Sequence, residues 1–284
     1  MKLFITGSDG FIGSALVSEC TRRGIEVVGV DVRSGFDVRS QDIAERIPVE
    51  TDAVIHLAGL SNDTACKGKG RECFDINVMG TLNLMEAAER KRAQQFIFAS
   101  TEWVYDRCTA EEVKHEESFI NIASHTSEYA LSKLVSEANL RQKYQNGFMP
   151  TTILRFGIVC GTTGEKKSAV ESLFLTVKEK EVVTVGSLKT GRCFIHVSDI
   201  ASGIIKSIGL DGFQIINLAG DALVTLRDII EISKEILHKN PNIVEINPAS
   251  ISVRNISNAK AKKMLGWKPE VTVAAWLGKL HAST

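Results

Sequence analysis

The sequence has no excess of charge of either sign, because its 284 residues carry 34 Lys and Arg against 34 Asp and Glu. A balanced chain has no global basic field that would attract nucleic acid or a membrane surface. Long apolar runs are also missing: the first, in "MKLFITG", stops at Gly7, and later ones are interrupted by charges. From this pattern we expect neither a signal h-region nor a spanning helix. We therefore expect an unanchored, cytoplasmic protein whose partner is a small molecule or a second copy of the chain.

The six cysteines lack the spacing of a metal site or a disulfide framework, since they include no Cys-x-x-Cys pair and no nearby histidine partner. Scattered cysteines of this kind are typical of reduced thiols in a reducing compartment. Zinc is not expected on this spacing, and we predict no metal site. The six positions are Cys20, Cys66, Cys73, Cys108, Cys160 and Cys193.

Short apolar strands alternate with amphipathic helices over the first hundred residues. Strands are expected at "KLFIT", "IEVVGVD", "DAVIHLAG" and "QFIFAS", with helices between them and a long one over 70–91. This alternation predicts α/β class, with a doubly wound parallel sheet (Rossmann) covered by helices on both faces. We assign 1–157 to this domain, with segments from about 190–218 returning to it, and 158–284 mainly to a smaller substrate-binding domain.

Glycines Gly7, Gly10 and Gly13 fall in the turn between the first strand and the first helix. Such a turn needs glycine for its bend, for close approach of the backbone to a pyrophosphate, and for packing of helix against strand. The helix then begins with Phe11 and Ile12, and its N-terminus supplies amide donors and a positive dipole. A glycine triplet alone is a weak signal, but in the first strand–turn–helix unit it predicts dinucleotide binding.

An acidic residue, Asp31, ends the second strand 18 residues after Gly13. A carboxylate at this place can accept hydrogen bonds from both adenosine ribose hydroxyls and repels a 2′-phosphate. The spacing therefore favours NAD over NADP. Arg33 leaves NADP open, since a nearby arginine could accommodate the extra phosphate.

Tyrosine is scarce, with three in the chain, yet Tyr129 lies four residues before Lys133 in "SEYALSKLVSEAN", which is predicted to open a helix. A match to Tyr-x-x-x-Lys arises by chance in roughly one such chain in five. The pair therefore needs support from the rest of the sequence.

That support comes from a resemblance. The spacing of "TGSDGFIG" resembles the extended short-chain dehydrogenase/reductase family, in its NAD-dependent sugar epimerase/dehydratase branch. "FDVRS" is similar to the segment that meets adenine, which implies contacts from Asp37 and Val38. "HLAG" is similar to the strand end beneath the nicotinamide ribose, which implies that Leu57, Ala58 and Gly59 line the cofactor.

The resemblance continues over most of the chain. "NVMGT" has Asn77 in the family's position on the long helix, "FASTEWVYD" matches its Ser/Thr-rich strand end, and "TTILRFGIVCG" places Gly157 beside the nicotinamide. "GRCFIHVSDIASGI" and "NAKAKKMLGWKPEVT" resemble two later family motifs. The family implies NAD as cofactor and a nucleotide-sugar as substrate.

The resemblance also implies a catalytic trio of Thr101, Tyr129 and Lys133. A free phenol ionises near pH 10, and an ammonium one helical turn away, together with the nicotinamide charge, is expected to lower that value. Lys133 would also anchor the ribose. Thr101 would hydrogen-bond the substrate oxygen that Tyr129 deprotonates.

These roles fit a 4-epimerase, in which a transient keto intermediate regains hydride on its other face without net redox change. Dehydratases of the branch place Asp-Glu after the threonine, and decarboxylases keep a Glu at the second position. This chain has Glu102 and Trp103 there. Trp103 cannot transfer a proton, but Glu102 keeps a dehydratase-like variant open. The sequence is also compatible with a dehydrogenase or reductase, and with a dinucleotide-binding regulator that lacks catalysis.

The substrate side departs from the family pattern in two places. Arg155 is followed three residues later by Ile158 where an Asn is usual, and the C-terminal diphosphate arginine has no clear match, although Arg254 lies near its place. Arg192 does match a diphosphate-contacting arginine. Family members commonly pair two long helices across a two-fold axis, so we expect a homodimer through the helix over 127–146.

Overall fold

A computed structural model describes residues 1–105, 108–163 and 166–283. The chain divides into two compact units. The first comprises Met1–Asp106, Phe119–Arg155 and Ala201–Ile216, and the second Arg107–Ser118, Phe156–Ile200 and Asn217–Thr284. The assignment of cofactor binding to residues 1–157, with segments from about 190–218, and of substrate binding mainly to 158–284 stays a prediction.

The first unit is built on a six-stranded sheet in the order β12-β5-β4-β3-β1-β2. Its strands are β1 (Lys2–Thr6), β2 (Glu26–Val30), β3 (Ala53–His56), β4 (Phe96–Thr101), β5 (Thr151–Phe156) and β12 (Phe213–Leu218). Strand β1 pairs in parallel with both β2 and β3, and β3 pairs in parallel with β4. The expected doubly wound α/β class is confirmed. Because β2 and β3 flank β1, the strand order reverses there, and in open parallel sheets ligands bind outside the carboxyl ends at such a point.

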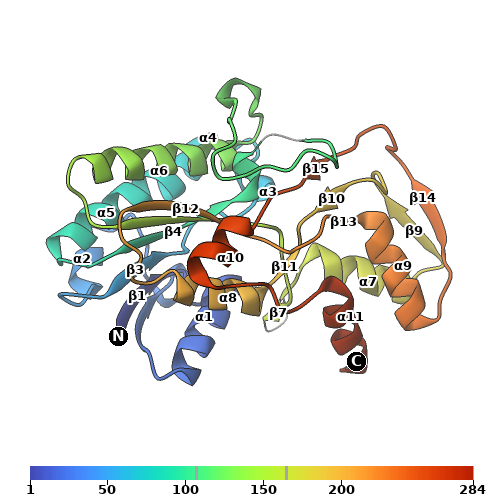
Figure 1. Cartoon of the computed structure of the whole chain (residues 1–284), viewed down its shortest axis with the longest axis horizontal. Helices are drawn as coiled ribbons and strands as arrows, with labels where there is room; N and C mark the ends of the chain where they lie inside the picture. The colour runs from blue at the N-terminus through green and yellow to red at the C-terminus, as the bar shows by residue number, and fades with distance from the viewer. Residues whose placement is uncertain (106–107, 164–165, 284) are drawn as a thin grey trace. The chain divides into compact units, whose positions relative to one another are not determined.

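Helices cover both faces of this sheet. Figure 1 shows α2, α5 and α6 along one face and α1 and α8 along the other. Their bounds are α1 (Phe11–Arg22), α2 (Ile43–Arg46), α3 (Asp63–Cys66), α4 (Gly70–Phe74), α5 (Gly80–Arg90), α6 (Glu128–Gln145) and α8 (Val197–Lys206). Short 3-10 turns lie at Val32–Ser34, Glu102–Val104 and Ile122–Ser124.

The long helix predicted over 70–91 is interrupted. Between α4 and α5, residues Asp75–Met79 form a π-helical turn. Such a turn adds a residue to the helical repeat and is frequent at functional sites. Hydrophobic spacing does not reveal it, because the apolar face continues on both sides of the insertion.

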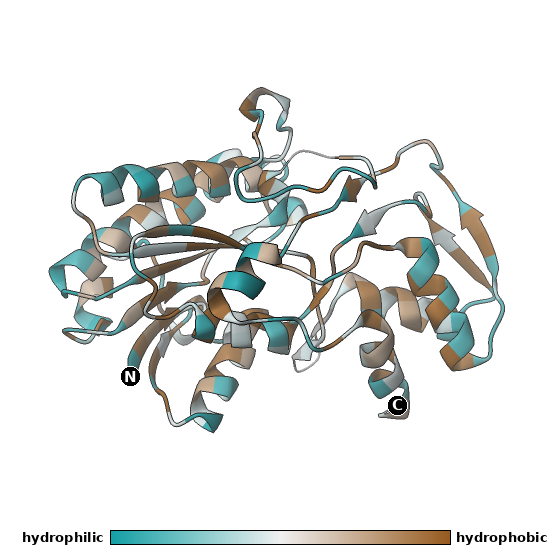
Figure 2. Cartoon of the chain, in the orientation of Figure 1, coloured by the Kyte–Doolittle hydropathy of each residue, from teal (hydrophilic) through white to brown (hydrophobic). Residues whose placement is uncertain are grey.

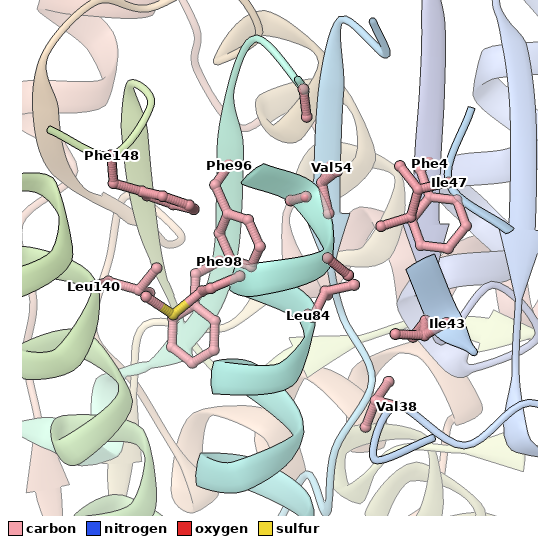
Figure 3. Close-up of a cluster of buried hydrophobic side chains, with 14 of the residues drawn as sticks. Phe4, Val38, Ile43, Ile47, Val54, Leu84, Phe96, Phe98, Leu140 and Phe148 are labelled. Carbon is pink, nitrogen blue, oxygen red and sulfur yellow. The ribbon is translucent and has the colours of Figure 1, made fainter. Parts of the chain in front are cut away.

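One buried cluster of the first unit lies between the sheet and the helices α2, α5 and α6. Figure 3 shows strand side chains from one face of the sheet meeting side chains of these helices. The cluster includes Phe4, Val54, Phe96, Phe98, Ile43, Ile47, Leu84, Leu140 and Phe148. Burial of each such side chain contributes about 1.5–3 kcal/mol. The hydropathy colours follow this arrangement, with brown strands between helices that carry teal outer turns (Figure 2).

The second unit is built from short strands and from helices of 7 to 12 residues. Its sheets are a three-stranded one in the order β13-β10-β15 and the pairs β11-β6, β14-β9 and β7-β8. The strands are β6 (Val159–Cys160), β7 (Thr162–Thr163), β8 (Lys166–Lys167), β9 (Val182–Val185), β10 (Gly191–Arg192), β11 (Ile195–His196), β13 (Val224–Thr225), β14 (Asn242–Glu245) and β15 (Val253–Arg254). The helices are α7 (Ala169–Glu179), α9 (Leu226–Leu237), α10 (Ala259–Leu265) and α11 (Val273–Ala282). Phe174, Ile229 and Leu277 form one buried cluster from α7, α9 and α11.

Within the described ranges, no helix is both long enough and apolar enough to cross a membrane.

Candidate active site and dinucleotide site

The glycine turn after β1 is tight enough to exclude side chains. Gly7 has φ +74°, and a Cβ there would lie 2.8 Å from the backbone nitrogen of Ala58. A Cβ on Gly13 would lie 2.0 Å from the carbonyl oxygen of Gly7. These contacts meet two of the needs expected of the turn, a sharp bend and close packing of α1 on β1.

The start of α1 offers free amides. Its N-cap is Gly10, which has extended backbone and no side chain to cap the helix, and the first turn contains no acidic residue. The amides at the start of an α-helix have no partner inside the helix. The stretch from Gly10 through Phe11 and Ile12 to Gly13 is therefore suited to a pyrophosphate, which needs amide donors and the positive end of a helix.

Asp31 follows β2 and is buried beside this turn. One carboxylate oxygen accepts a hydrogen bond from the amide of Arg33 at 3.0 Å, and the other accepts one from the amide of Asp9 at 3.2 Å. A carboxylate has about four acceptor positions, so two stay available for ribose hydroxyls. The Arg33 guanidinium donates to the carbonyl oxygen of Asp9 and lies 3.9 Å from the Asp31 carboxylate.

The two residues expected to contact adenine, Asp37 and Val38, differ in their burial and partners. Val38 is buried, and its carbonyl oxygen accepts a hydrogen bond of 2.7 Å from the side chain of Asn83. Asp37 forms an ion pair with Arg39, which holds the pKa of the Asp37 carboxyl below its usual value. Arg39 also pairs with Asp75 at 2.7 Å, which connects this loop to the π-helical turn.

The segment after β3 lies against the buried side chains of Asn77 and Lys133. The Leu57 amide donates to the carbonyl oxygen of Thr6 at 3.1 Å, and the Ala58 amide donates to the Thr6 hydroxyl at 3.3 Å. A Cβ on Gly59 would lie 2.7 Å from Asn77 Oδ1 and 3.8 Å from Lys133 Nζ. Gly59 therefore lies close to both side chains, and a side chain at this position would collide with Asn77.

Asn77 projects from the π-helical turn and is fully buried. Its Oδ1 accepts a hydrogen bond of 2.8 Å from the amide of Leu60, and its Nδ2 donates to the Leu60 carbonyl at 3.0 Å and to Ser132 Oγ at 2.9 Å. Ser132 Oγ donates in turn to the carbonyl oxygen of Tyr129 at 2.8 Å. Asn77 thus joins the loop after β3 to the first turn of α6.

Tyr129 and Lys133 occupy successive turns of α6, which begins after the N-cap Ser127. Both side chains are buried. Lys133 Nζ donates to the carbonyl oxygen of Ala99 at 2.9 Å and lies 4.7 Å from the centre of the Phe98 ring. Thr101, at the end of β4, is hydrogen-bonded to the Tyr129 phenol. The structure therefore brings together the three residues that the resemblance implied.

The pKa values of this pair run opposite to one expectation. Burial raises the pKa of Tyr129 to about 12, and the hydrogen bond with Thr101 only partly opposes the rise. Burial lowers the pKa of Lys133 to about 8, against nearby groups that include Glu137. The expected lowering of the phenol pKa counted on the ammonium together with the nicotinamide charge. In the chain by itself, desolvation of the fully buried phenol dominates and the pKa lies above its usual value.

Glu102 is completely buried in the 3-10 turn after Thr101. Its negative charge raises the pKa of Tyr129, which places the carboxylate within electrostatic reach of the phenol. Its burial shows that Glu102 is not a solvated loop charge. Its neighbour Trp103 donates its amide to Thr101 Oγ1 at 3.2 Å.

A buried ionic network behind the trio was not anticipated. Glu137, one turn after Lys133, accepts hydrogen bonds from Arg155 Nε at 3.0 Å and Arg155 Nη2 at 2.6 Å. Ser100 also donates to Glu137, and Arg155 Nη1 donates to the Tyr105 hydroxyl at 2.9 Å. The signal in the sequence was a glutamate four residues after Lys133, on the same helix face. This network connects β4, β5 and α6 next to the catalytic candidates.

The second unit contains the expected substrate arginines on neighbouring strands. Arg192 of β10 and Arg254 of β15 are paired in parallel register. Arg192 donates to the carbonyl oxygen of Ser252 at 2.6 Å, and Arg254 is buried. Two arginines on paired strands suit phosphate oxygens.

Two other residues of this unit, Gly157 and Asp199, come from motifs that resemble the family. A Cβ on Gly157 would lie 2.4 Å from the carbonyl oxygen of Cys193, so only glycine fits there. Asp199 lies within α8, and its carboxylate accepts a hydrogen bond from the amide of Val271 at 3.0 Å. Among the described residues, no three His, Cys, Asp or Glu side chains gather as a metal site.

Comparisons with known proteins agree with this geometry. Residues 3–219 match the model of the "NAD dependent epimerase/dehydratase family". UDP-glucuronic acid decarboxylase 1 of Arabidopsis thaliana is 26% identical over an alignment 308 residues long. The alignment covers 99% of this chain and 69% of the relative. UDP-glucuronate 4-epimerase of Thermodesulfobacterium geofontis is 27% identical over 300 residues, covering 95% of this chain and 91% of the relative.

The fold is also shared with solved structures. MoeE5 in complex with UDP-glucuronic acid and NAD superposes with a TM-score of 0.87 at 23% identity, over 100% of both chains.

Proposed function

Because the chain belongs to the NAD dependent epimerase/dehydratase family, we propose that it is an NAD-dependent epimerase that inverts carbon 4 of a nucleotide-activated sugar. The observation that carries this proposal is the meeting of Thr101, Tyr129 and Lys133 at the carboxyl end of β4 and the start of α6. The family match supports NAD as the cofactor.

The residues present fit a dinucleotide. The glycine turn leaves room that a Cβ would fill, the start of α1 has uncapped amides, and the Asp31 carboxylate has acceptor positions left. Arg33 is engaged with Asp9, which supports the choice of NAD over NADP. Bound NAD supplies a reversible hydride acceptor.

The residues of the chain then manage the proton. The Tyr129 phenolate takes the proton from a secondary hydroxyl of the sugar, while Thr101 holds the same oxygen by a hydrogen bond. Lys133 lies beside Gly59, where its ammonium can reach ribose hydroxyls and stabilise the phenolate. The keto sugar turns over and regains hydrogen on its other face, and Tyr129 returns the proton.

A second candidate is a dehydratase-type or decarboxylase reaction. It is favoured by the buried Glu102, whose charge reaches Tyr129, and by the decarboxylase name of the Arabidopsis relative. Trp103 opposes it, because an indole cannot transfer a second proton. A dehydrogenase or reductase, and a dinucleotide-binding regulator without catalysis, are distinguished from both by the test below.

We propose that three residues contact the substrate. We assign Arg192 and Arg254 to the diphosphate and Glu102 to the sugar, since two arginines on paired strands and a buried carboxylate suit those groups. UDP-glucuronate is the first substrate to test, because it appears in the names of both relatives.

We also propose a cytoplasmic homodimer. All six cysteines are free, which fits a reducing compartment. On α6, Leu131, Leu134 and Val135 are only half-buried and Ala138 is exposed, so this apolar stripe is not absorbed into the core of the chain. Such a stripe suits pairing of α6 with its copy across a two-fold axis.

The test is to incubate purified protein with UDP-, dTDP- and GDP-sugars, including UDP-glucuronate, without added cofactor. Products are separated by chromatography and NADH absorbance is followed at the same time. A new 4-epimer with flat absorbance supports the proposal. Carbon dioxide release supports a decarboxylase, and rising NADH absorbance on addition of NAD supports a dehydrogenase. Absence of turnover on every sugar, with NAD bound, supports the regulator.

A further inference from the structure

Two buried cysteines lie together beneath the candidate base. Cys66 ends α3 and Cys73 lies in α4, and their sulfur atoms are 2.6 Å apart. Both side chains are completely buried and belong to one cluster with Tyr129, Leu60 and Trp103. Sulfur atoms joined in a disulfide are about 2.05 Å apart, so little movement separates this pair from a bonded one.

We propose that Cys66 and Cys73 are a reversible oxidation site, at which a peroxide joins the two thiols in an intramolecular disulfide next to Tyr129. The two cysteines are close in space because the chain turns back between them. The loop over 67–69 that connects the cysteines is exposed, and Gly68 adopts φ +72°. This turn brings the start of α4 back against the end of α3.

The chemistry balances with hydrogen peroxide as oxidant. One thiol loses its proton and its sulfur attacks a peroxide oxygen, so that the O–O bond breaks, a sulfenic acid forms and one water leaves. The second thiol attacks that sulfur, so that the S–O bond breaks, the S–S bond forms and a second water leaves. Two thiols are oxidised and one peroxide is reduced. A dithiol reductant reverses the bond by exchange.

Burial sets the conditions for this reaction. Desolvation raises the pKa of the Cys66 thiol to about 12, which keeps it protonated in the closed structure. Oxidation is therefore expected to be slow and to depend on opening of the exposed loop over 67–69, through which a small peroxide can enter. A large oxidant is expected to react far more slowly.

A disulfide between Cys66 and Cys73 would change the contacts that hold the catalytic candidates in place. The Cys73 sulfur lies 3.6 Å from Ser132 Oγ and 3.7 Å from Asn77 Nδ2, the two groups that connect α6 to the loop after β3. A disulfide removes the thiol hydrogen of Cys73, whose sulfur lies 3.7 Å from the carbonyl oxygen of Glu128 and 3.6 Å from Ser132 Oγ. We expect oxidation to lower activity and a dithiol to restore it, an effect that rests on the proposed function.

The sequence provides a direct assay for the bond. Trypsin cleaves after Lys67, Lys69 and Arg71, which lie between the two cysteines, so the peptides 47–67 and 72–90 separate unless a disulfide joins them. Folded, NAD-loaded protein is treated with hydrogen peroxide, blocked with N-ethylmaleimide, denatured and digested without reductant. We expect the joined peptide, and a fall in free thiols from six to four.

Matched variants sharpen the result. Cys66→Ser should give no joined peptide, and its activity should keep its untreated value under peroxide. Cys20→Ser, which removes a buried cysteine of α1 outside the pair, should still give the joined peptide. A joined peptide that forms only after urea, or none in the folded protein, overturns the site.

The two proposals fail separately. The peptide map does not depend on turnover, so a joined peptide in a protein inactive on every nucleotide-sugar overturns the proposed function alone. An active enzyme without the joined peptide overturns the oxidation site alone. Full joining with unchanged activity overturns the effect on the catalytic site.

Discussion

The Arg155 guanidinium holds the Glu137 carboxylate through two hydrogen bonds, of 3.0 and 2.6 Å, and both side chains are buried. Arg155 lies in β5 and Glu137 lies one turn after Lys133 in α6. Ser100, the residue before Thr101, donates to the same carboxylate. The network therefore sets the position of α6 against the ends of β4 and β5, and with it the position of the catalytic candidates.

Substitution Glu137→Gln should cost much stability. It leaves the Arg155 charge buried without its counter-charge, and loss of one partner of a buried pair costs about 3–5 kcal/mol. The exposed pair of Lys143 and Glu89, at 2.9 Å, is the matched control, and Glu89→Gln should cost about 0–1 kcal/mol. Urea unfolding measures both. Equal free energies of unfolding for the two variants would contradict the role of the network.

Substitution Tyr129→Phe should remove catalysis while NAD binding survives. General acid–base catalysis contributes about 100- to 10,000-fold, so kcat should fall by that range while the affinity for NAD changes little. Tyr144, farther along α6, packs on Phe213 and serves as the control. Tyr144→Phe should keep kcat. A Tyr129→Phe enzyme with undiminished kcat would overturn the assignment of the base.

The pH profile should report Lys133. The active form needs the Tyr129 phenolate and the Lys133 ammonium, whose pKa values in the chain are about 12 and about 8. Below about pH 8 the phenolate population rises tenfold per pH unit, so kcat/KM should rise with it. Above that value, loss of the ammonium offsets the gain, and the profile should level off. The positive charge of the nicotinamide lowers both values.

The control for this profile is Lys133→Arg. A guanidinium stays charged over the whole range, so the rise should continue past the pH at which the wild-type profile levels off. Stopped assays between about pH 6 and about pH 9 give kcat/KM for both proteins. The same break in the arginine variant would assign it to another group.

Substitution Gly13→Ala should damage the dinucleotide site. The new Cβ would lie 2.0 Å from the carbonyl oxygen of Gly7, so the turn must open, with an overpacking cost of about 1–3 kcal/mol and weaker NAD binding. Gly278 in α11 has no atom near such a Cβ, and Gly278→Ala should stabilise by about 0.5–1 kcal/mol. Calorimetric NAD titration and urea unfolding measure both effects. Unchanged NAD affinity in Gly13→Ala would show that the turn does not meet the cofactor.

Features set by local spacing could be predicted from the sequence. The alternation of strands and helices predicted the doubly wound sheet, and the glycines of the first turn lie where their spacing placed them. Tyr129 and Lys133 are brought together by one helical turn, which depends on α6 alone. Thr101 required the resemblance, because its partner lies on a different element.

Features that depend on tertiary neighbours could not be predicted. Glu137 and Arg155 are 18 residues apart, and only the packing of α6 on β5 joins them. Cys66 and Cys73 meet because the chain turns back between two short helices. The rise of the Tyr129 pKa in the chain by itself could not be predicted for the same reason, since it is set by how completely the surrounding elements exclude water.

His56 provides a buried, uncharged link inside the first unit. Its Nδ1 lies 2.8 Å from Thr6 Oγ1 and its Nε2 lies 3.0 Å from Thr81 Oγ1. Burial, and secondarily the charge of Lys133, lowers the pKa of His56 to about 3. The folded protein therefore keeps this ring neutral at a pH where an unfolded chain, with a histidine pKa of about 6.5, takes up a proton.

Acid should destabilise the wild type through this residue. Between the folded and unfolded pKa values the unfolded chain binds the extra proton, so stability falls as the pH falls. From about pH 7 to about pH 5 the loss is about 2 kcal/mol, from 1.36 kcal/mol per pH unit below the unfolded pKa. His56→Gln should be less stable at neutral pH but should lack this part of the acid dependence, whereas His115→Gln, at an exposed site, should keep it. Urea unfolding at the two pH values measures the difference, and an identical acid loss in His56→Gln and wild type would show that His56 is not the group that titrates.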